Sequence, residues 1–145
     1  MTNIHVATDP DQIKRCAPVL RELRTFLTEE EITSRVQQQM KDGYRLAYVE
    51  AAETVASVAG YRMLRNLTYG KFLYVDDLVT RADHKRTGCA GQLLEWLCEH
   101  ARDQACSFLI LDSGVQRFEA HRFYLGHRMD ITAHHFARKL EARNQ

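Results

Sequence analysis

Apolar positions in the first part of the chain recur at the spacing of a helix. A short strand pattern over residues 4–7 is followed by Asp9-Pro10, which places a capping side chain directly before a proline suited to the first helical turn. Three or four residues then separate successive apolar side chains, which predicts an amphipathic helix. These side chains are Ile13, Ala17, Leu20, Leu23 and Leu27.

A second helix pattern begins at Thr28. Thr28 and Glu31 have the spacing of a capping box, in which each side chain accepts a hydrogen bond from the other residue's backbone N–H. The helix is predicted to run through Met40 and to end at Asp42-Gly43, because glycine readily adopts the left-handed conformation that terminates helices. The acidic run 29–31 also suits the positive end of a helix dipole.

Strand patterns dominate the middle of the chain. Residues 44–50, 54–63 and 70–80 are rich in β-branched and aromatic residues, and short turn sequences separate them. Three consecutive strands with short connections predict an antiparallel meander.

The last part of the chain returns to helices. Residues 90–105 carry an apolar stripe and form the clearest predicted helix. Residues 107–112 are almost continuously apolar, as in a strand that is buried on both faces. A short helix over 116–125, ended by Gly126, and one or two closing strands within 130–140 complete the pattern. This order predicts the α+β class with a mixed, mostly antiparallel sheet.

The composition fits a single domain spanning residues 1–145, because 45% hydrophobic residues are enough for one sizeable core. Lys and Arg number 20 against 19 Asp and Glu, so there is no general electrostatic attraction for nucleic acid or an anionic membrane. No apolar run approaches the roughly 18 residues of a membrane span, and no secretory signal is visible. Four cysteines fit neither a disulfide framework nor a zinc site and indicate a reducing cytoplasm: Cys16, Cys89, Cys98 and Cys106.

The most informative stretch is Lys85-Arg-Thr-Gly-Cys-Ala-Gly91, a basic loop with two glycines between a predicted strand and a predicted helix. A helix N-terminus exposes unpaired backbone N–H groups and the positive end of the dipole, so it suits an anion such as a pyrophosphate. Glycine allows the backbone to approach the anion closely. The loop matches neither a Walker sequence nor a dinucleotide fingerprint. An ordinary glycine-containing turn with solvated charges is the alternative for the local pattern.

The loop resembles the signature [QR]-x-x-G-x-[GA] of the GNAT superfamily, with Lys85, Gly88 and Ala90 at its three defined positions. Lys85 keeps the positive charge of the usual arginine but lacks its bidentate fork. A second segment, 120–128, resembles the A-x-x-F-Y helix and following glycine turn of the same superfamily. The element order matches over nearly the whole chain, and small bacterial-type and polyamine-type members are similar.

The resemblance implies the GNAT fold, with a central sheet of six to seven strands flanked by about four helices. It also implies an N-acetyltransferase that moves an acetyl group from acetyl-CoA to a primary amine by direct attack in a ternary complex. Acetyl-CoA is then the co-substrate, and a small molecule or a peptide supplies the amine. The expected location is the cytoplasm, and the superfamily tends towards homodimers.

Direct transfer needs a base for the ammonium, donors for the developing oxyanion and a proton for the leaving thiolate. The resemblance implies Tyr124 as the general acid and Asp76 as the base or ammonium anchor. Successive strand residues point to opposite faces, so only one of Asp76 and Asp77 is expected to face the acceptor. The backbone near Leu78 is the expected oxyanion donor. The residues expected to bind the co-substrate are Leu78, Val79, Thr80, Lys85, Arg86, Thr87, Gly88, Cys89, Ala90 and Gly91.

The sequence leaves alternatives open. A structural role is the alternative for Tyr124 and for both aspartates. A catalytically silent acyl-CoA-binding sensor is the alternative for the whole protein, and the presence of both Tyr124 and Asp76 argues against it. The acidic run 29–31 favours a cationic acceptor or is a solvated helix start. No His or Cys spacing predicts a metal site, and Cys89 is expected to face the core rather than act as a nucleophile.

Overall fold

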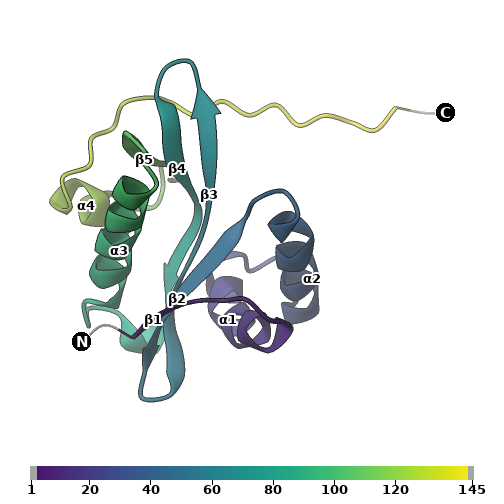
Figure 1. Cartoon of the computed structure of the whole chain (residues 1–145). Helices are drawn as coiled ribbons and strands as arrows, with labels where there is room; N and C mark the ends of the chain where they lie inside the picture. The colour runs from purple at the N-terminus through teal and green to yellow at the C-terminus, as the bar shows by residue number, and fades with distance from the viewer. Residues whose placement is uncertain (1–2, 144–145) are drawn as a thin grey trace. The chain divides into compact units, whose positions relative to one another are not determined.

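The computed structural model describes residues 3–143 (Figure 1). Within them the chain forms five strands, four α-helices and one short 3-10 helix, joined by loops. The chain divides into two compact units, Met1–Leu111 and Asp112–Gln145, and each is described here by itself. The single domain expected over 1–145 stays a prediction. The elements are β1 Ile4–Val6, α1 Pro10–Leu23, α2 Glu29–Met40, β2 Arg45–Ala51, β3 Thr54–Asn66, β4 Gly70–Thr80, η1 Ala82–His84, α3 Cys89–Asp103, β5 Phe108–Leu111 and α4 Phe118–Gly126.

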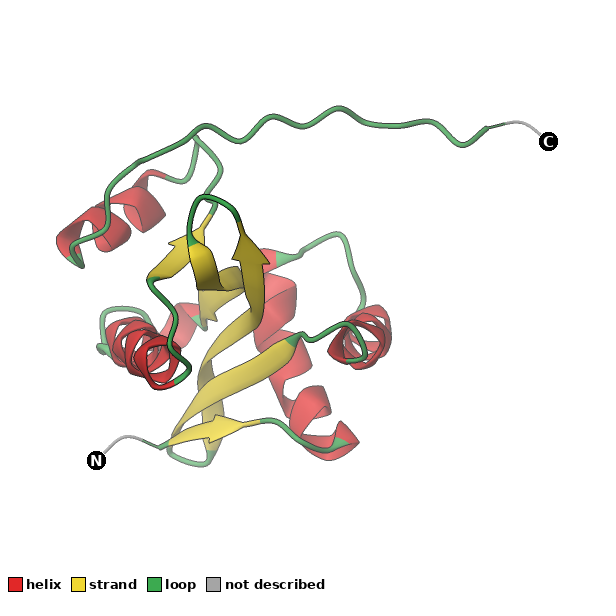
Figure 2. Cartoon of the chain, turned by 45° about the horizontal axis from the view of Figure 1, so that its top comes forward, coloured by secondary structure: helices red, strands yellow, loops and turns green. Residues whose placement is uncertain are grey.

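The first unit is built on one sheet whose strands stand in the order β1-β2-β3-β4-β5. Strands β1 to β4 pair antiparallel, which confirms the predicted meander, and β5 pairs parallel to β4. Helices α1 and α2 cover one face of this sheet and α3 covers the other (Figures 1 and 2). The site described below lies between the α1–α2 pair and the sheet.

Both predicted helix starts are confirmed. Asp9 accepts a hydrogen bond from the backbone N–H of Gln12 at 2.9 Å, and the Gln12 side chain accepts one from the backbone of Asp9. Thr28 and Glu31 form the predicted capping box in the same way. Such caps satisfy first-turn N–H groups that have no partner inside the helix, so these two boundaries are local in origin. Helix α1 ends at Leu23, earlier than its apolar spacing predicts.

The core of the first unit lies where α1 and α2 meet the sheet. Its members are buried apolar side chains that alternate along the strands and recur at helical spacing along α1 and α2. The opposite face of the sheet packs on the stripe of α3 that includes Leu93, Leu94 and Leu97, all almost completely buried. Among the described residues, no helix combines the length and the hydrophobicity that crossing a bilayer requires.

The predicted six to seven strands are wrong, since the described residues form five. Residues 130–140, expected to supply one or two closing strands, are neither helix nor strand. Their large apolar side chains, Ile131, Phe136 and Leu140, stand five and four residues apart, so they cannot share one face of a strand. All three are exposed, and no residue after 129 pairs with a strand in the described chain.

Strand β5 differs from its prediction in a second way. Its continuous apolar run predicts burial on both faces, but Phe108 is 51% exposed and the other three residues are half-buried. The reason is topological, because β5 stands at the edge of the described sheet and pairs only with β4. A central parallel strand would be covered on both sides, whereas an edge strand is not.

Candidate functional site

A β-bulge in β4 decides which carboxylates reach the site. Gly60 of β3 pairs with Asp77, and the next residue, Tyr61, pairs with Val75. Asp76 is therefore an extra residue that has no pairing partner on β3. This insertion interrupts the alternation of side chains along β4. As a result Asp76 and Asp77 both line the same pocket. The expectation that only one of the two would face it is wrong, because strict alternation holds only in an unbulged strand.

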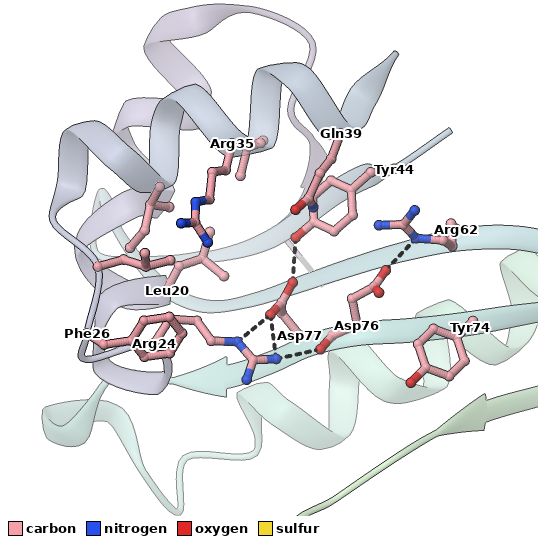
Figure 3. A pocket seen from close by; sticks show the side chains of 13 residues that line it. Leu20, Arg24, Phe26, Arg35, Gln39, Tyr44, Arg62, Tyr74, Asp76 and Asp77 are labelled. Atoms are coloured by element: carbon pink, nitrogen blue, oxygen red, sulfur yellow. Dashed lines mark hydrogen bonds and ion pairs between the residues drawn. The ribbon is translucent and has the colours of Figure 1, made fainter. Parts of the chain in front are cut away.

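The pocket has a volume of about 340 Å³ and lies between α1, α2 and the sheet (Figure 3). Its lining mixes apolar, polar and charged side chains. They come from the α1–α2 pair with its connecting loop and from the sheet, so the pocket exists only in the folded chain. Its lining residues are Leu20, Arg24, Phe26, Leu27, Ile32, Arg35, Val36, Gln39, Tyr44, Arg62, Tyr74, Asp76 and Asp77.

Asp77 is held by partners on two sides. Arg24, just beyond the end of α1, donates from Nε to its Oδ1 at 2.9 Å, and the hydroxyl of Tyr44 donates to its Oδ2 at 2.8 Å (Figure 3). Burial, together with Asp77 itself, raises the pKa of Tyr44 well above its ordinary value, so Tyr44 stays a neutral donor. Asp77 thus uses both oxygens inside the protein.

Glycine at position 60 makes this arrangement possible. A Cβ placed on Gly60 would lie 1.7 Å from the Tyr44 hydroxyl oxygen, far inside any contact distance. The absence of a side chain lets the buried ring of Tyr44 lie against β3 and reach Asp77. Gly60 also sits directly before the change of register, where a strand bends most readily.

Asp76 is held less completely. Its Oδ2 accepts a hydrogen bond from Nε of Arg62 at 2.8 Å, and its backbone carbonyl, displaced from the ladder by the bulge, accepts one from Arg24 at 2.9 Å. No residue in the described part of the chain donates to Oδ1. Burial raises the pKa of Asp76 above its ordinary value, an effect that Arg62 opposes and the neighbouring charge of Asp77 reinforces. Asp76 is therefore a partly buried carboxylate with one oxygen open to the pocket.

The loop after β4 has the backbone geometry of an anion cradle. Gly88 is the N-cap of α3 and has a φ of 86°, in the left-handed region that glycine adopts without strain. Arg86 also has a positive φ, of 65°. The first helical hydrogen bond runs from the N–H of Gln92 to the carbonyl of Gly88, so the N–H groups of 89–91 have no acceptor within the helix.

Space is also present at this loop. A Cβ placed on Gly88 would meet no atom within 4 Å, so the protein itself does not occupy the position. Residues 85–88 are exposed, whereas Cys89 is buried, as expected for a side chain that faces the core. The residues present therefore fit a pyrophosphate, with open N–H groups, a helix dipole and basic side chains beside them.

The edge of β4 opens as the strand approaches this loop. β5 pairs with β4 only from Phe72 to Val75, where Leu111 ends the strand. Beyond Val75, β4 has no strand partner on the β5 side among the described residues. A parallel strand that stops short in this way leaves a stretch of backbone that an extended ligand can pair with.

The register shows which β4 groups face that open edge. The N–H of Arg81 donates to the carbonyl of Ala56 at 2.8 Å, so these two residues form a hydrogen-bonded antiparallel pair. Such pairs alternate with pairs whose backbone groups point away from each other. Val79 therefore faces β3, whereas the N–H and C=O groups of Leu78 and Thr80 point to the open side.

Tyr124 lies on α4, in the second unit. It is half-buried, and burial raises the pKa of its phenol above the ordinary value, although Arg117 opposes the shift. The hydroxyl is therefore protonated at neutral pH, as a proton donor must be. Helix α4 ends at Gly126, which confirms the predicted short helix. The catalytic role of Tyr124 stays a prediction.

Sequence reasoning missed most partners of the two aspartates. Arg24 follows α1, Arg62 lies on β3 and Tyr44 directly precedes β2. No motif connects these three residues. The available signal was Gly60, an isolated glycine inside a strand pattern, which indicates a bulge or a close approach of another group. Within residues 3–143, no three His, Cys, Asp or Glu side chains are grouped as a metal ion would require.

Comparison with known proteins bears on this geometry. The sequence model of the acetyltransferase (GNAT) family matches residues 14–127. A relative from Bacillus subtilis (strain 168), the uncharacterized N-acetyltransferase YhdJ, is 30% identical over 125 residues, which cover 86% of this chain and 88% of that protein. The region matched by the family model includes the bulged strand β4, the glycine loop 85–91 and helix α4, which carries Tyr124.

Solved structures share the fold at low sequence identity. Ribosomal-protein-alanine N-acetyltransferase from Brucella melitensis biovar Abortus 2308 has a TM-score of 0.83 at 14% identity, over 97% of this chain and 100% of that one. The aminoglycoside N-acetyltransferase AAC(6′)-Iy, solved in complex with CoA, has a TM-score of 0.83 at 7% identity, over 98% of this chain and 97% of that one.

Proposed function

The chain belongs to the acetyltransferase (GNAT) family, and from this premise we propose that it moves an acetyl group from acetyl-CoA to a primary amine by direct attack in a ternary complex. The observation that carries the proposal is the continuity of residues 76–91. This one segment presents an open carboxylate to a pocket, then an open strand edge, then an anion cradle. Those are the three features that an amine, a pantetheine arm and a pyrophosphate require.

The cradle would hold the pyrophosphate of acetyl-CoA. Backbone N–H groups near Gly88 and the N-terminus of α3 supply the main donors, and the positive charges of Lys85 and Arg86 add to them. The remaining members of the loop, Thr87 and residues 89–91, contribute mostly through their main chain. This division explains why lysine at position 85 is compatible with binding, since the fork of arginine is not needed where amides do most of the work.

The open edge of β4 would hold the pantetheine arm in the manner of an added strand. Leu78 and Thr80 point their N–H and C=O groups to that side. Val79, which was expected to offer backbone groups as well, turns them to β3 and packs its side chain against the core, so it would only support this edge. The N–H of Leu78 is the proposed donor to the thioester oxygen as negative charge develops on it. The thioester itself supplies an activated acyl carbon.

Acid and base roles fall to Asp76 and Tyr124. Asp76 anchors the ammonium through its open Oδ1 and accepts its proton, directly or through a water molecule, so that a neutral amine forms. The N–C bond then forms as the C–S bond breaks, and Tyr124 donates its proton to the sulfur. The nitrogen loses its second proton to water, the Tyr124 phenolate takes up a proton from water, and Asp76 releases its proton to solvent. Tyr124 carries this role by its match to the family motif, and its raised pKa supports a protonated phenol.

The Gly88→Val substitution tests the cradle. Valine adds a β-branched side chain at a φ of 86°, which costs roughly 1–3 kcal/mol of strain, and it fills the space that the pyrophosphate would occupy. We expect CoA affinity, measured by calorimetry, to fall about 100-fold or more, a loss that corresponds to the strength of one or two hydrogen bonds to a charged group.

A matched control separates strain from ligand contact. Gly70 also has a positive φ, of 67°, and open space around its Cβ position, but it is the first residue of β4, directly after the β3–β4 turn. Gly70→Val should lose similar stability and keep its CoA affinity. Unchanged affinity in a folded Gly88→Val protein would show that CoA binds elsewhere.

A further inference from the structure

The charges that line the pocket do not balance among themselves. Three arginines and two aspartates face it, and four of these five groups form two ion pairs (Figure 3). Arg24 pairs with Asp77 at 2.9 Å, and Arg62 pairs with Asp76 at 2.8 Å. Arg35 is the cation left over, and it has no ion pair or hydrogen bond among residues 3–143.

Arg35 has no ion-pair partner among the residues of its own helix, α2. The carboxylate one turn earlier on α2, that of Glu31, accepts a hydrogen bond from the backbone N–H of Thr28 at 3.2 Å and completes the helix cap. That side chain is therefore committed to the start of α2 and not to the usual pairing four residues on. Figure 3 shows the guanidinium of Arg35 directed from α2 into the pocket.

The acidic run 29–31 does not offset this charge. None of its three residues lines the pocket, and all are exposed on the first turn of α2. The cationic acceptor that this run favours at the level of sequence therefore has no support from the pocket lining. A second ammonium in the pocket would face an uncompensated guanidinium instead.

The other lining residues indicate which further chemical features a ligand of this pocket must have. Arg35 enters from α2 and Asp76 from β4, on different sides of the pocket (Figure 3). The lining also includes apolar side chains that offer no hydrogen bonds, and most of these belong to the buried core. They are Leu20, Phe26, Leu27, Ile32 and Val36. A complementary ligand has a cation at one end, an anion at the other and an apolar body.

We propose that the acceptor is a primary amine that also carries an anionic group, a carboxylate or a phosphate, which Arg35 binds while the amine is held at Asp76. This substrate class rests on the proposed N-acetyltransferase function. A guanidinium suits both anions, because its donors form a fork that matches their oxygen atoms. Arg35 is then a specificity residue, which acts on binding and not on the acetyl transfer itself.

Matched pairs of amines test the proposal, with release of free thiol from acetyl-CoA as the readout. 6-Aminohexanoate against hexylamine, and 4-(aminomethyl)benzoate against benzylamine, differ by one carboxylate at the far end of an apolar body from the amine. 6-Aminohexyl phosphate against 6-amino-1-hexanol differs by one phosphate. We expect at least one member that carries the anionic group to exceed its partner without that group about tenfold or more in kcat/KM, the value of one charge-assisted contact. Which pair responds identifies the anion.

The variant Arg35→Gln should remove that preference. We expect KM for the amine that carries the anionic group to rise about tenfold with little change in kcat, while the partner amine that lacks this group is unaffected. Arg21→Gln is the matched control, since Arg21 is an exposed arginine on α1 that does not line the pocket. Arg35 is itself exposed, so its substitution should leave the melting temperature unchanged.

The outcomes separate the two proposals. Equal or better turnover of all the amines that lack an anionic group, or equal loss for both members of a pair in Arg35→Gln, would overturn the anionic acceptor and leave the acetyltransferase function standing. Tight CoA binding without thiol release on addition of any of these amines or of a polyamine such as spermidine would overturn both. Preference for spermidine would restore the cationic acceptor and refute ours.

Discussion

Replacing Gly60 by alanine should disturb the site indirectly, because the new side chain would displace Tyr44. The new Cβ would stand 1.7 Å from the Tyr44 hydroxyl oxygen, 2.3 Å from Cζ and 2.7 Å from Cε2. The ring is 1% exposed and surrounded by the core, so it has no free direction in which to move. Either β3 shifts or the bond from Tyr44 to Asp77 breaks.

The magnitude follows from these two costs. Overpacking a core position typically costs about 1–3 kcal/mol. A hydrogen bond to a charged group contributes about 1.5–3 kcal/mol. Because movement of Tyr44 relieves the first cost by incurring the second, the two do not add fully. We therefore expect Gly60→Ala to lower the free energy of unfolding by about 2–4 kcal/mol.

Chemical denaturation of four proteins measures this effect: the original protein, Gly60→Ala, Tyr44→Leu and the double variant. Leucine at position 44 removes the atoms nearest the new Cβ, so the double variant should be more stable than the sum of the single changes predicts. Gly126→Ala serves as the control, because a Cβ there meets nothing within 4 Å. A Gly60→Ala protein within about 0.5 kcal/mol of the original, the usual range for surface changes, would refute the packing argument.

Two further predictions concern acid and base catalysis. Tyr124→Phe keeps the ring and removes the proton donor, so CoA affinity should persist while turnover falls about 10²-fold or more; loss of melting temperature with an unchanged rate would instead mark Tyr124 as structural. Asp76 accepts a proton only when ionised, and its pKa is raised, so kcat/KM should increase with pH through a limb that lies above the ordinary aspartate value of about 3.9. Asp76→Asn should lower the rate and remove that limb, and a pH profile that keeps it would exclude Asp76 as the base.

Local signals in the sequence predicted the parts of the fold that short segments control. The two helix starts were predictable because Asp9 and Thr28 satisfy N–H groups only three residues away. The backbone conformation of the loop was predictable because a left-handed glycine at the start of a helix is a local feature, and Gly88 has a positive φ. The meander followed from three strand patterns with short turns between them.

Tertiary contacts decided what those segments do together. A segment such as 130–140 becomes a strand only where another edge takes up its backbone groups, and no residue pattern states whether such an edge is available. The pocket likewise depends on residues far apart in the chain, such as Arg24 and Asp77, which are brought together only by packing of the helices on the sheet.

The bulge in β4 shows most clearly what the sequence determines and what only the tertiary structure decides. The sequence by itself determined that two adjacent carboxylates precede a basic loop with two glycines, since Asp76 and Asp77 are visible in the chain. Whether they share a face depends on the register between β3 and β4, which one extra residue changes. The charge of the pocket was equally hidden, because Arg35 lacks a partner within residues 3–143 only as a result of where the other arginines and Glu31 make their bonds. Side-chain pairing over long sequence distances is set by packing, so only the tertiary structure decides it.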